Sequence, residues 1–173
     1  MAEPVSILSR KLQFETVFED YYERIYKYTY TLLLNKEDAE DVTGNTFLFA
    51  YANYGRYDAD RASIGTWLTR IAHNCAVNLL QSAARRKRAD MPEDWEMAGG
   101  GDFTEQVETS DVLLRLYEKL SLEEREFLNL RYTMELKDKE IAELLHLKEK
   151  TVNKRYQRLL ARCRKILEES CHD

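Results

Sequence analysis

The sequence predicts an all-α protein built from two small helical domains, and three observations lead to this prediction. Residues with high helix propensity dominate the 173-residue chain, which contains only six Gly and two Pro. Apolar residues recur at alternating spacings of three and four, as they do on one side of an α-helix. An acidic stretch without this period, residues 89–111, predicts a flexible linker between a domain at 1–88 and a second domain at 112–173.

The first domain is expected to contain three helices. The apolar stripe of the first helix consists of Phe14, Phe18, Tyr21, Ile25, Tyr28 and Leu32. Asn35 offers an N-cap for a second helix that runs to about Asn53, because its side chain can accept a hydrogen bond from the first turn. Residues 54–63 are typical of a loop, and a third helix then begins at Ile64 and ends in the basic run 85–88.

The second domain is expected to contain four helices. The first covers 111–120, and the segment 121–124 (Ser-Leu-Glu-Glu) is a capping box that opens the next. Asp138 is placed as the N-cap of a short helix. Residues 146–148 form a tight turn, and a long final helix covers about 149–169. His146 stands where such a turn tends to need positive φ, which His tolerates better than most residues.

The charge is distributed unevenly along the chain, although the net charge is −5. Residues 1–88 carry 12 basic and 11 acidic side chains, whereas residues 89–111 carry no basic and 8 acidic ones. Within residues 146–165 there are eight basic side chains and one acidic one, Glu149. A local basic stripe matters more for DNA binding than the average charge, so the final helix is the first candidate for nucleic-acid contact.

The spacing around the predicted turn indicates a helix-turn-helix. Ala142 is small where two helices must cross closely, and Leu147 fills the turn. The inner face of the final helix comprises Val152, Tyr156, Leu159 and Cys163, and its outer face comprises Lys150, Asn153, Lys154, Gln157 and Arg158. Outer-face side chains of these types bond base edges, while Arg155 and Arg162 flank that face and suit phosphates. The competing interpretation is a solvated basic face on an ordinary helical hairpin.

The first domain has a different kind of candidate surface. A loop rich in Tyr and Arg precedes Trp67 and contains Tyr54, Arg56, Tyr57 and Arg61. A polar stripe on the third helix consists of Arg70, Asn74 and Asn78. Aromatic rings beside positive charges suit single-stranded DNA, whose unpaired bases stack on rings and whose phosphates attract cations. The alternative is that these aromatics, Trp67 above all, belong to the core and that the charges are solvated.

The sequence predicts no catalytic, metal or cofactor site. His73 and His146 have no partner signature, and no nucleophile or phosphate-binding loop is evident. The three cysteines (Cys75, Cys163 and Cys171) are widely spaced, which fits a reducing cytosol. No apolar run approaches the roughly 20 residues that span a bilayer, and no signal peptide is apparent, so a cytoplasmic protein without membrane insertion is expected.

Three segments resemble motifs of bacterial sigma factors of the extracytoplasmic-function (ECF) class of the sigma-70 family. Residues 38–42 (Asp-Ala-Glu-Asp-Val), with Thr46-Phe47, resemble the polymerase-binding helix. Residues 66–74 (Thr-Trp-Leu-Thr-Arg-Ile-Ala-His-Asn) resemble the promoter-melting segment. Residues 140–145 (Glu-Ile-Ala-Glu-Leu-Leu), with Thr151-Val152 and Arg155, resemble the second domain's helix-turn-helix. The three lie in the expected order and cover nearly the whole chain.

The resemblance implies a promoter-specificity subunit with two partners, core RNA polymerase and promoter DNA. Domain 1–88 would bind polymerase and capture unpaired bases of the −10 element, and domain 112–173 would read the −35 element as duplex. The linker would enter the polymerase, and an anti-sigma factor could hold the protein inactive. The implied site residues are Asn153, Lys154, Gln157 and Arg158 for −35 bases; Lys150, Thr151, Arg155 and Arg162 for phosphates; Arg61, Trp67, Arg70, Asn74 and Asn78 for the −10 element; and Asp38, Asp41 and Asn45 for polymerase.

The chain departs from the family pattern at several positions. Gly44-Asn45 stand where the family usually has Gln-Glu, Asn78 and Gln81 replace an aspartate and an arginine, and Lys154 replaces a common Ser. Two alternative functions stay open at this point. One is a stand-alone helix-turn-helix regulator that binds duplex DNA without polymerase. The other is a sigma-like interaction protein that binds polymerase or an inhibitor without starting transcription.

Overall fold

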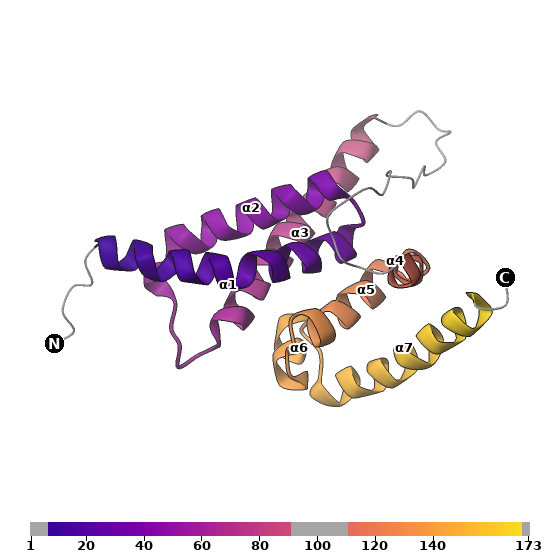
Figure 1. Ribbon diagram of the computed structural model, residues 1–173. Coiled ribbons are helices and arrows are strands. Elements are labelled where there is room, and N and C mark those ends of the chain that lie inside the picture. The colour runs from indigo at the N-terminus through magenta and orange to yellow at the C-terminus, as the bar shows by residue number, and fades with distance from the viewer. Residues whose placement is uncertain (1–6, 91–110, 171–173) are drawn as a thin grey trace.

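The computed structural model describes residues 7–90 and 111–170, with side chains at 13–86 and 111–169. Within these ranges every regular element is helical, and the helices form two domains that pack against each other (Figure 1). The predicted all-α class with two helical domains is therefore confirmed. Most of the predicted linker, residues 91–110, lies outside the described residues.

The first domain consists of α1 (Ile7–Leu33), α2 (Lys36–Asn53) and α3 (Ile64–Asp90). Helices α1 and α2 run side by side, and α3 packs against both (Figure 1). The core residues Ile25, Tyr28 and Leu68 are completely buried. The predicted stripe is wrong at Phe18, which is 42% exposed. Its ring instead covers Phe47 from outside, with the ring centroids 4.9 Å apart.

Helix α2 begins where the sequence predicts. Asn35 has an extended backbone, and its side-chain oxygen accepts the backbone N–H of Asp38 at 3.0 Å. This bond satisfies one of the donors that a helix N-terminus leaves open, and its loss typically costs about 1 kcal/mol. Deeper in the contact between α1 and α2, the hydroxyl groups of Thr29 and Thr43 are 2.9 Å apart and fully buried. A paired hydroxyl is the form in which such a polar group is tolerated in a core.

The loop between α2 and α3 contains the short 3-10 helix η1 (Tyr54–Arg56). The loop then leads to the start of α3, and within it the Tyr57 hydroxyl donates to the Ala62 carbonyl at 3.0 Å. Gly65 lies at the start of α3, where a Cβ atom would approach the Tyr21 ring to 3.0 Å. This position therefore allows α3 to approach α1 closely.

The second domain consists of α4 (Asp111–Glu118), α5 (Leu122–Leu128), η2 (Asn129–Thr133), α6 (Asp138–Leu144) and α7 (Glu149–Ser170). The predicted capping box is present: the Ser121 side chain accepts from Glu124, whose carboxylate accepts the Ser121 amide at 2.9 Å. The π-helical turn η2 was not predicted. It surrounds the fully buried Asn129, whose side-chain oxygen accepts the Tyr117 hydroxyl at 3.0 Å.

The predicted N-cap of α6 is wrong by one residue. Lys137 is the cap and Asp138 is the first helical residue. The Asp138 carboxylate instead pairs with Arg131, and the Lys137 amide donates to Glu140 at 2.9 Å. Asp138 serves a tertiary ion pair, which sequence periodicity does not reveal.

Candidate nucleic-acid interface

The turn between α6 and α7 has the geometry of a helix-turn-helix. His146 has φ 53°, as its place in the turn predicts, and the Leu147 amide donates to the Ala142 carbonyl at 2.8 Å. The Thr151 amide then donates to the Lys148 carbonyl at 2.8 Å, in the first turn of α7. Ala142 itself is buried, so the close crossing of α6 and α7 depends on its small side chain.

Helix α7 separates cleanly into a buried and an exposed face. The buried side chains are those predicted: Val152, Tyr156, Leu159 and Cys163. The exposed side chains include every predicted base reader: Asn153, Lys154, Gln157 and Arg158. Lys150 is also exposed, whereas Thr151 is half-buried. The structure thus presents one polar and basic surface, with donors and acceptors suited to a major groove.

Tyr156 fixes α7 to the rest of its domain. Its hydroxyl donates to the carbonyl of Phe127, and the guanidinium of Arg131 lies 4.4 Å from its ring centroid. Burial raises the pKa of Tyr156 well above its usual range, so the hydroxyl remains protonated and keeps donating. The direction of the outer face of α7 is therefore set by a buried hydrogen bond as well as by apolar packing.

The two predicted flanking arginines have partners inside the second domain. Arg155 lies over the Phe127 ring, 5.7 Å from its centroid. Arg162 pairs with Glu124 at 3.2 Å and donates to the Lys119 carbonyl at 3.4 Å. Both remain exposed at the surface, but a phosphate would compete with these contacts.

The predicted single-strand surface of the first domain is built around Trp67. This ring is half-buried and packs against two loop tyrosines, with centroid distances of 5.2 Å to Tyr57 and 6.5 Å to Tyr54. Trp67 thus belongs partly to the core, as the alternative interpretation held, and keeps an accessible part. Burial raises the pKa of Tyr57, so its ring stays neutral.

The polar stripe of α3 is only partly open to solvent. Asn74 and Asn78 are exposed, as is Arg61 in the preceding loop. Arg70 is half-buried and pairs with Glu143 of α6 at 2.9 Å. Its Nε atom is buried and has no hydrogen-bond partner among the described residues. The structure therefore groups these side chains on one helix but places the second domain against Arg70.

The outer face of α2 carries the predicted polymerase-binding residues. Asp41 and Asn45 are exposed there, and Asp38 is half-buried beside the helix N-terminus. Leu48 and Phe49, which the sequence analysis did not select, continue the same face with exposures of 70% and 56%. The sequence did indicate that some of these side chains are exposed, because three consecutive large apolar residues at 47–49 cannot all face inward on one helix. Exposed apolar side chains of this size often mark a protein-binding surface.

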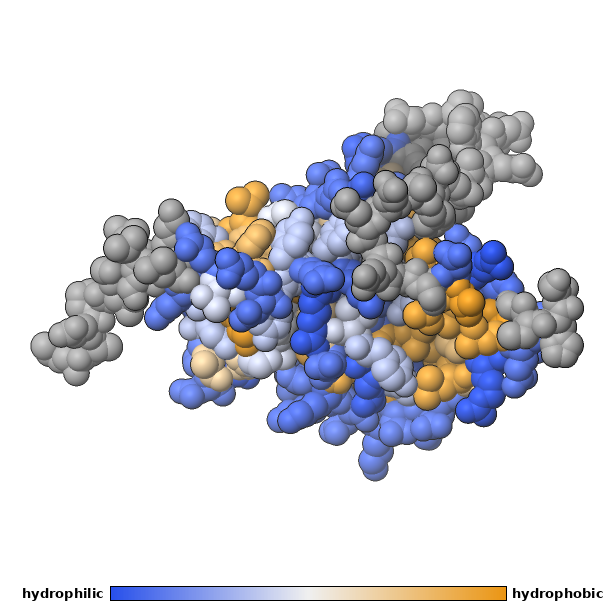
Figure 2. Space-filling model, in the orientation of Figure 1, coloured by the Kyte–Doolittle hydropathy of each residue, from blue (hydrophilic) through white to orange (hydrophobic). Residues whose placement is uncertain are grey.

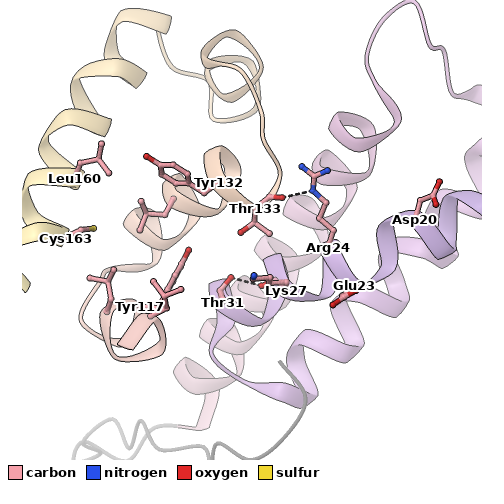
Figure 3. A pocket seen from close by; sticks show the side chains of 13 residues that line it. Asp20, Glu23, Arg24, Lys27, Thr31, Tyr117, Tyr132, Thr133, Leu160 and Cys163 are labelled. Carbon is pink, nitrogen blue, oxygen red and sulfur yellow. Dashed lines mark hydrogen bonds between the residues drawn. The ribbon is translucent and has the colours of Figure 1, made fainter. Parts of the chain in front are cut away.

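A pocket of about 560 Å³ opens between the two domains (Figure 3). From α1, Arg24 and Thr31 point towards it, and Tyr117, Tyr132 and Leu160 line the opposite wall. Apolar surface also gathers over the α4 and α7 side of the second domain, as Figure 2 shows. The exposed apolar side chains in that part include Val112, Leu113 and Leu160.

No metal centre is found among the described side chains. In residues 7–90 and 111–170 no three His, Cys, Asp or Glu side chains are grouped closely enough to hold a metal ion. Burial raises the pKa of both Cys75 and Cys163, so their thiols are poor nucleophiles. Across the described residues, no helix combines the length and apolar character needed to cross a membrane.

Comparison with known proteins assigns both domains. Residues 17–86 match the family model "Sigma-70 region 2", and residues 110–163 match "Sigma-70, region 4". The chain is 30% identical over 172 residues to the ECF RNA polymerase sigma factor SigW of Bacillus subtilis, covering 90% of this chain and 89% of that protein. The chain belongs to the ECF RNA polymerase sigma factors. This sigma factor is also 27% identical over 157 residues to BldN of Streptomyces coelicolor, covering 86% of this chain and 59% of BldN.

A solved sigma factor confirms the fold. RpoE of Bartonella quintana, crystallised with the anti-sigma factor NepR, superposes with a TM-score of 0.77 at 17% identity, covering 90% of this chain and 97% of that one. The sigma factor described here is a promoter-specificity subunit, and its partners are core RNA polymerase and promoter DNA. Sigma factors are in general not enzymes; they act through the polymerase that they direct.

Proposed function

We propose that α7 reads the −35 element in the major groove with Asn153, Lys154, Gln157 and Arg158. The assignment rests on one observation: the four side chains are exposed on one face of α7, while its opposite face is buried. Arg or Lys can bond guanine and Asn or Gln can bond adenine, so this face can specify a sequence. Lys150, Thr151, Arg155 and Arg162 surround it and would hold the phosphate backbone.

The −10 element is assigned to the first domain. Trp67 offers a ring on which an unpaired base can stack, and Arg61, Arg70, Asn74 and Asn78 supply charge and hydrogen bonds beside it. This division gives a first domain at 1–88, a linker at 89–111 and a −35-reading domain at 112–173. The proposal also places the protein in the cytoplasm, as a subunit without a catalytic site of its own.

Polymerase binding is assigned to the outer face of α2. Asp38, Asp41 and Asn45 lie on or beside this face, and Leu48 and Phe49 add apolar area to it. An interface with an apolar centre and a polar rim is the usual form of a protein–protein contact. Gly44, where the family usually has a long polar residue, leaves open space: a Cβ atom there would meet nothing within 4 Å.

The test is specific initiation in a purified system. The protein is mixed with core polymerase and linear promoter DNA, and transcripts from the expected start are measured. Specific transcripts support the proposal. Duplex binding without core polymerase would favour a stand-alone regulator, and core binding without transcripts would favour a sigma-like interaction protein. Leu48→Glu should abolish core binding, whereas Leu122→Glu, at a side chain 41% exposed in the second domain, should not.

An anti-sigma factor is a further proposed partner, by analogy with RpoE, which was crystallised with one. The interdomain pocket and the apolar surface beside it give such a protein a place to bind, with Asp20, Glu23 and Lys27 at the pocket as charged partners. Leu113→Glu and Leu160→Glu should each block inhibition by a cognate anti-sigma factor without preventing transcription in its absence.

A further inference from the structure

Two adjacent rows of side chains lie on the solvent side of α1, one aromatic and one charged. The aromatic row consists of Phe18, Tyr22, Tyr26 and Tyr30, and the charged row consists of Glu15, Glu19, Glu23 and Lys27. Residues four apart lie one above the other on a helix, so each set forms a continuous row. Each charged residue precedes an aromatic one by three positions, which makes the two rows neighbours. We call these residues the acidic–aromatic face.

The aromatic row is held in place by ring contacts. The Phe18 and Tyr22 ring centroids are 4.9 Å apart, and those of Tyr26 and Tyr30 are 6.1 Å apart. Phe47 of α2 supports the first pair, with centroid distances of 4.9 Å to Phe18 and 5.8 Å to Tyr22. Phe18 and Tyr22 are nevertheless 42% and 39% exposed. Rings that neighbours fix and solvent still reaches are preorganised for a partner, because their binding costs little side-chain entropy.

The charged row is acidic over its first three members, Glu15, Glu19 and Glu23, which are all exposed. In the part of the chain that the structure describes, none of the three forms an ion pair. Nor does any Lys or Arg of that part lie over a ring of the aromatic row. The carboxylates and the exposed rings are therefore available to a cation that a partner supplies.

Carboxylates of neighbouring helices strengthen the negative potential along the aromatic row. Burial first, and then the charge of Glu40 on α2, raise the pKa of Tyr26. Burial and then the charge of Glu118 on α4 raise the pKa of Tyr30. The two phenols therefore stay neutral beside fixed negative charges. Such a face repels nucleic acid and anionic lipid, so its charge favours a basic protein segment as the occupant.

Arginine is the side chain that fits both rows at once. Its planar guanidinium can lie on a Tyr ring while its N–H groups pair with a carboxylate, a combination that the compact lysine ammonium does not offer. The face covers residues 15–30 and is about 24 Å long, given a rise of 1.5 Å per helical residue. A partner helix with arginine at every fourth position matches the spacing of both rows over about four turns.

We propose that the acidic–aromatic face is a docking site for a basic helix of a protein partner other than core polymerase, whose arginines stack on the tyrosines and pair with the glutamates. The inference goes beyond the proposed function, because none of these residues is a proposed DNA or polymerase contact. The residues proposed for polymerase lie on the outer side of α2, whereas α2 borders this face with Phe47 and Glu40. Only Glu23 and Lys27, at one end of the face, also line the interdomain pocket.

The experiment measures binding of a synthetic helix to the full chain by fluorescence anisotropy. The probe is a labelled, alanine-based peptide of about 18 residues with arginine at every fourth position, and a second peptide carries glutamine in place of arginine. The test variants are Glu15→Lys with Glu19→Lys, and separately Tyr22→Ser. Two controls match them at exposed positions of the second domain: Asp111→Lys with Glu123→Lys, and Tyr132→Ser, whose side chain lines the pocket.

The arginine peptide should bind the parent protein, and its affinity should fall by about tenfold in each test variant, because ring stacking or ion pairs are lost. The controls should match the parent, and the glutamine peptide should bind about tenfold more weakly than the arginine peptide. Test variants that match the parent would overturn the proposal. An equal loss in Tyr132→Ser would also overturn it, because the peptide would then lie in the pocket.

The affinity for core polymerase separates this face from the polymerase interface. Both test variants should bind core polymerase as tightly as the parent does. A loss as large as that in Leu48→Glu would assign the face to the polymerase and overturn the separate docking site, while the proposed promoter-reading role would stand. Far-UV circular dichroism verifies that each variant keeps its helices.

Discussion

The two DNA-binding surfaces of this sigma factor differ in how they are made available. On α7 the candidate base readers project into solvent. Packing within the second domain alone determines which side chains of α7 face outward. On α3 the candidate residues share one helix, but Arg70 is paired with a carboxylate from the other domain. Exposure on α7 is thus a property of a helix in its own domain. On α3 the exposure of Arg70 depends also on how the two domains pack.

This difference has a consequence for mutational data. A substitution on α7 should change DNA affinity directly, because no part of the described chain has to move first. A substitution of Arg70 changes both the contact with DNA and the contact with the second domain, so its two effects can oppose each other. Four predictions test the comparison, beginning with the largest expected effect.

Val152→Asp should unfold the second domain, whereas Asn153→Asp should leave it folded. Val152 is completely buried between the helices, and an unpaired carboxylate there costs several kcal/mol. Asn153 is exposed one position later on α7, so the same new charge costs little stability but should repel the DNA backbone. Circular dichroism during thermal unfolding distinguishes the two. Equal stability of both variants would show that the two faces of α7 are assigned wrongly.

Arg158→Ala should cost about 1–3 kcal/mol of binding to a −35 duplex and relax specificity at one base pair. Binding is measured against a set of duplexes that differ at single positions. Lys165→Ala is the control, on the same helix but paired with Glu169 at 3.8 Å. It should weaken binding to all duplexes slightly and by the same factor. If Arg158→Ala weakens every duplex by the same factor, Arg158 is a phosphate contact and not a base reader.

Trp67→Ala should weaken single-strand binding by about 1–3 kcal/mol, the usual loss when a stacking ring is removed. Trp67→Phe retains a ring and should recover much of the affinity. A loss in Trp67→Phe as large as that in Trp67→Ala would mean that no base stacks on this ring.

Gly44→Ala should stabilise the first domain by about 1 kcal/mol and leave polymerase binding unchanged. Ala has the higher helix propensity, and a Cβ atom at this position meets nothing within 4 Å. For a chain of this size the melting temperature should rise by about 2–4 °C. Reduced affinity for core polymerase would instead show that the missing side chain leaves room for the partner.

The sequence predicted features that depend on neighbouring residues. The Asn35 cap, the Ser121 capping box and the positive φ of His146 each follow from local hydrogen bonding or backbone preference, and each is confirmed. Features that depend on distant contacts were missed. Asp138 looked like a cap because Asp is a favoured N-cap residue, and its ion pair with Arg131 forms only once the chain has turned between η2 and α6. The π-helical turn η2 depends on a buried Asn129 that bonds to Tyr117 and to Thr31 of the other domain.

The candidate site shows the same division. The exposed residues of α7 could be predicted from the spacing of its apolar residues, because a helix with one buried face has an exposed one. The ion pair that covers Arg70 could not be predicted, since Glu143 is distant in sequence and no periodicity links the two residues. Leu48 and Phe49 fall between these cases. Their position was predictable, but apolar residues are assigned to a core by default, and only the packed structure shows them in solvent.

The chemistry of the boundary between the domains also bears on the solubility of the opened protein. Thr31 donates across this boundary to Asn129, whose oxygen also accepts hydroxyls from Tyr117 and Thr133 within its own domain. When the domains part, Asn129 loses one donor and keeps two, and water can hydrate the Glu140 and Glu143 carboxylates. Separation therefore exposes polar groups at this contact together with apolar residues of the core that the two domains share. An opened chain should therefore be more prone to aggregate unless a partner protein covers that apolar surface.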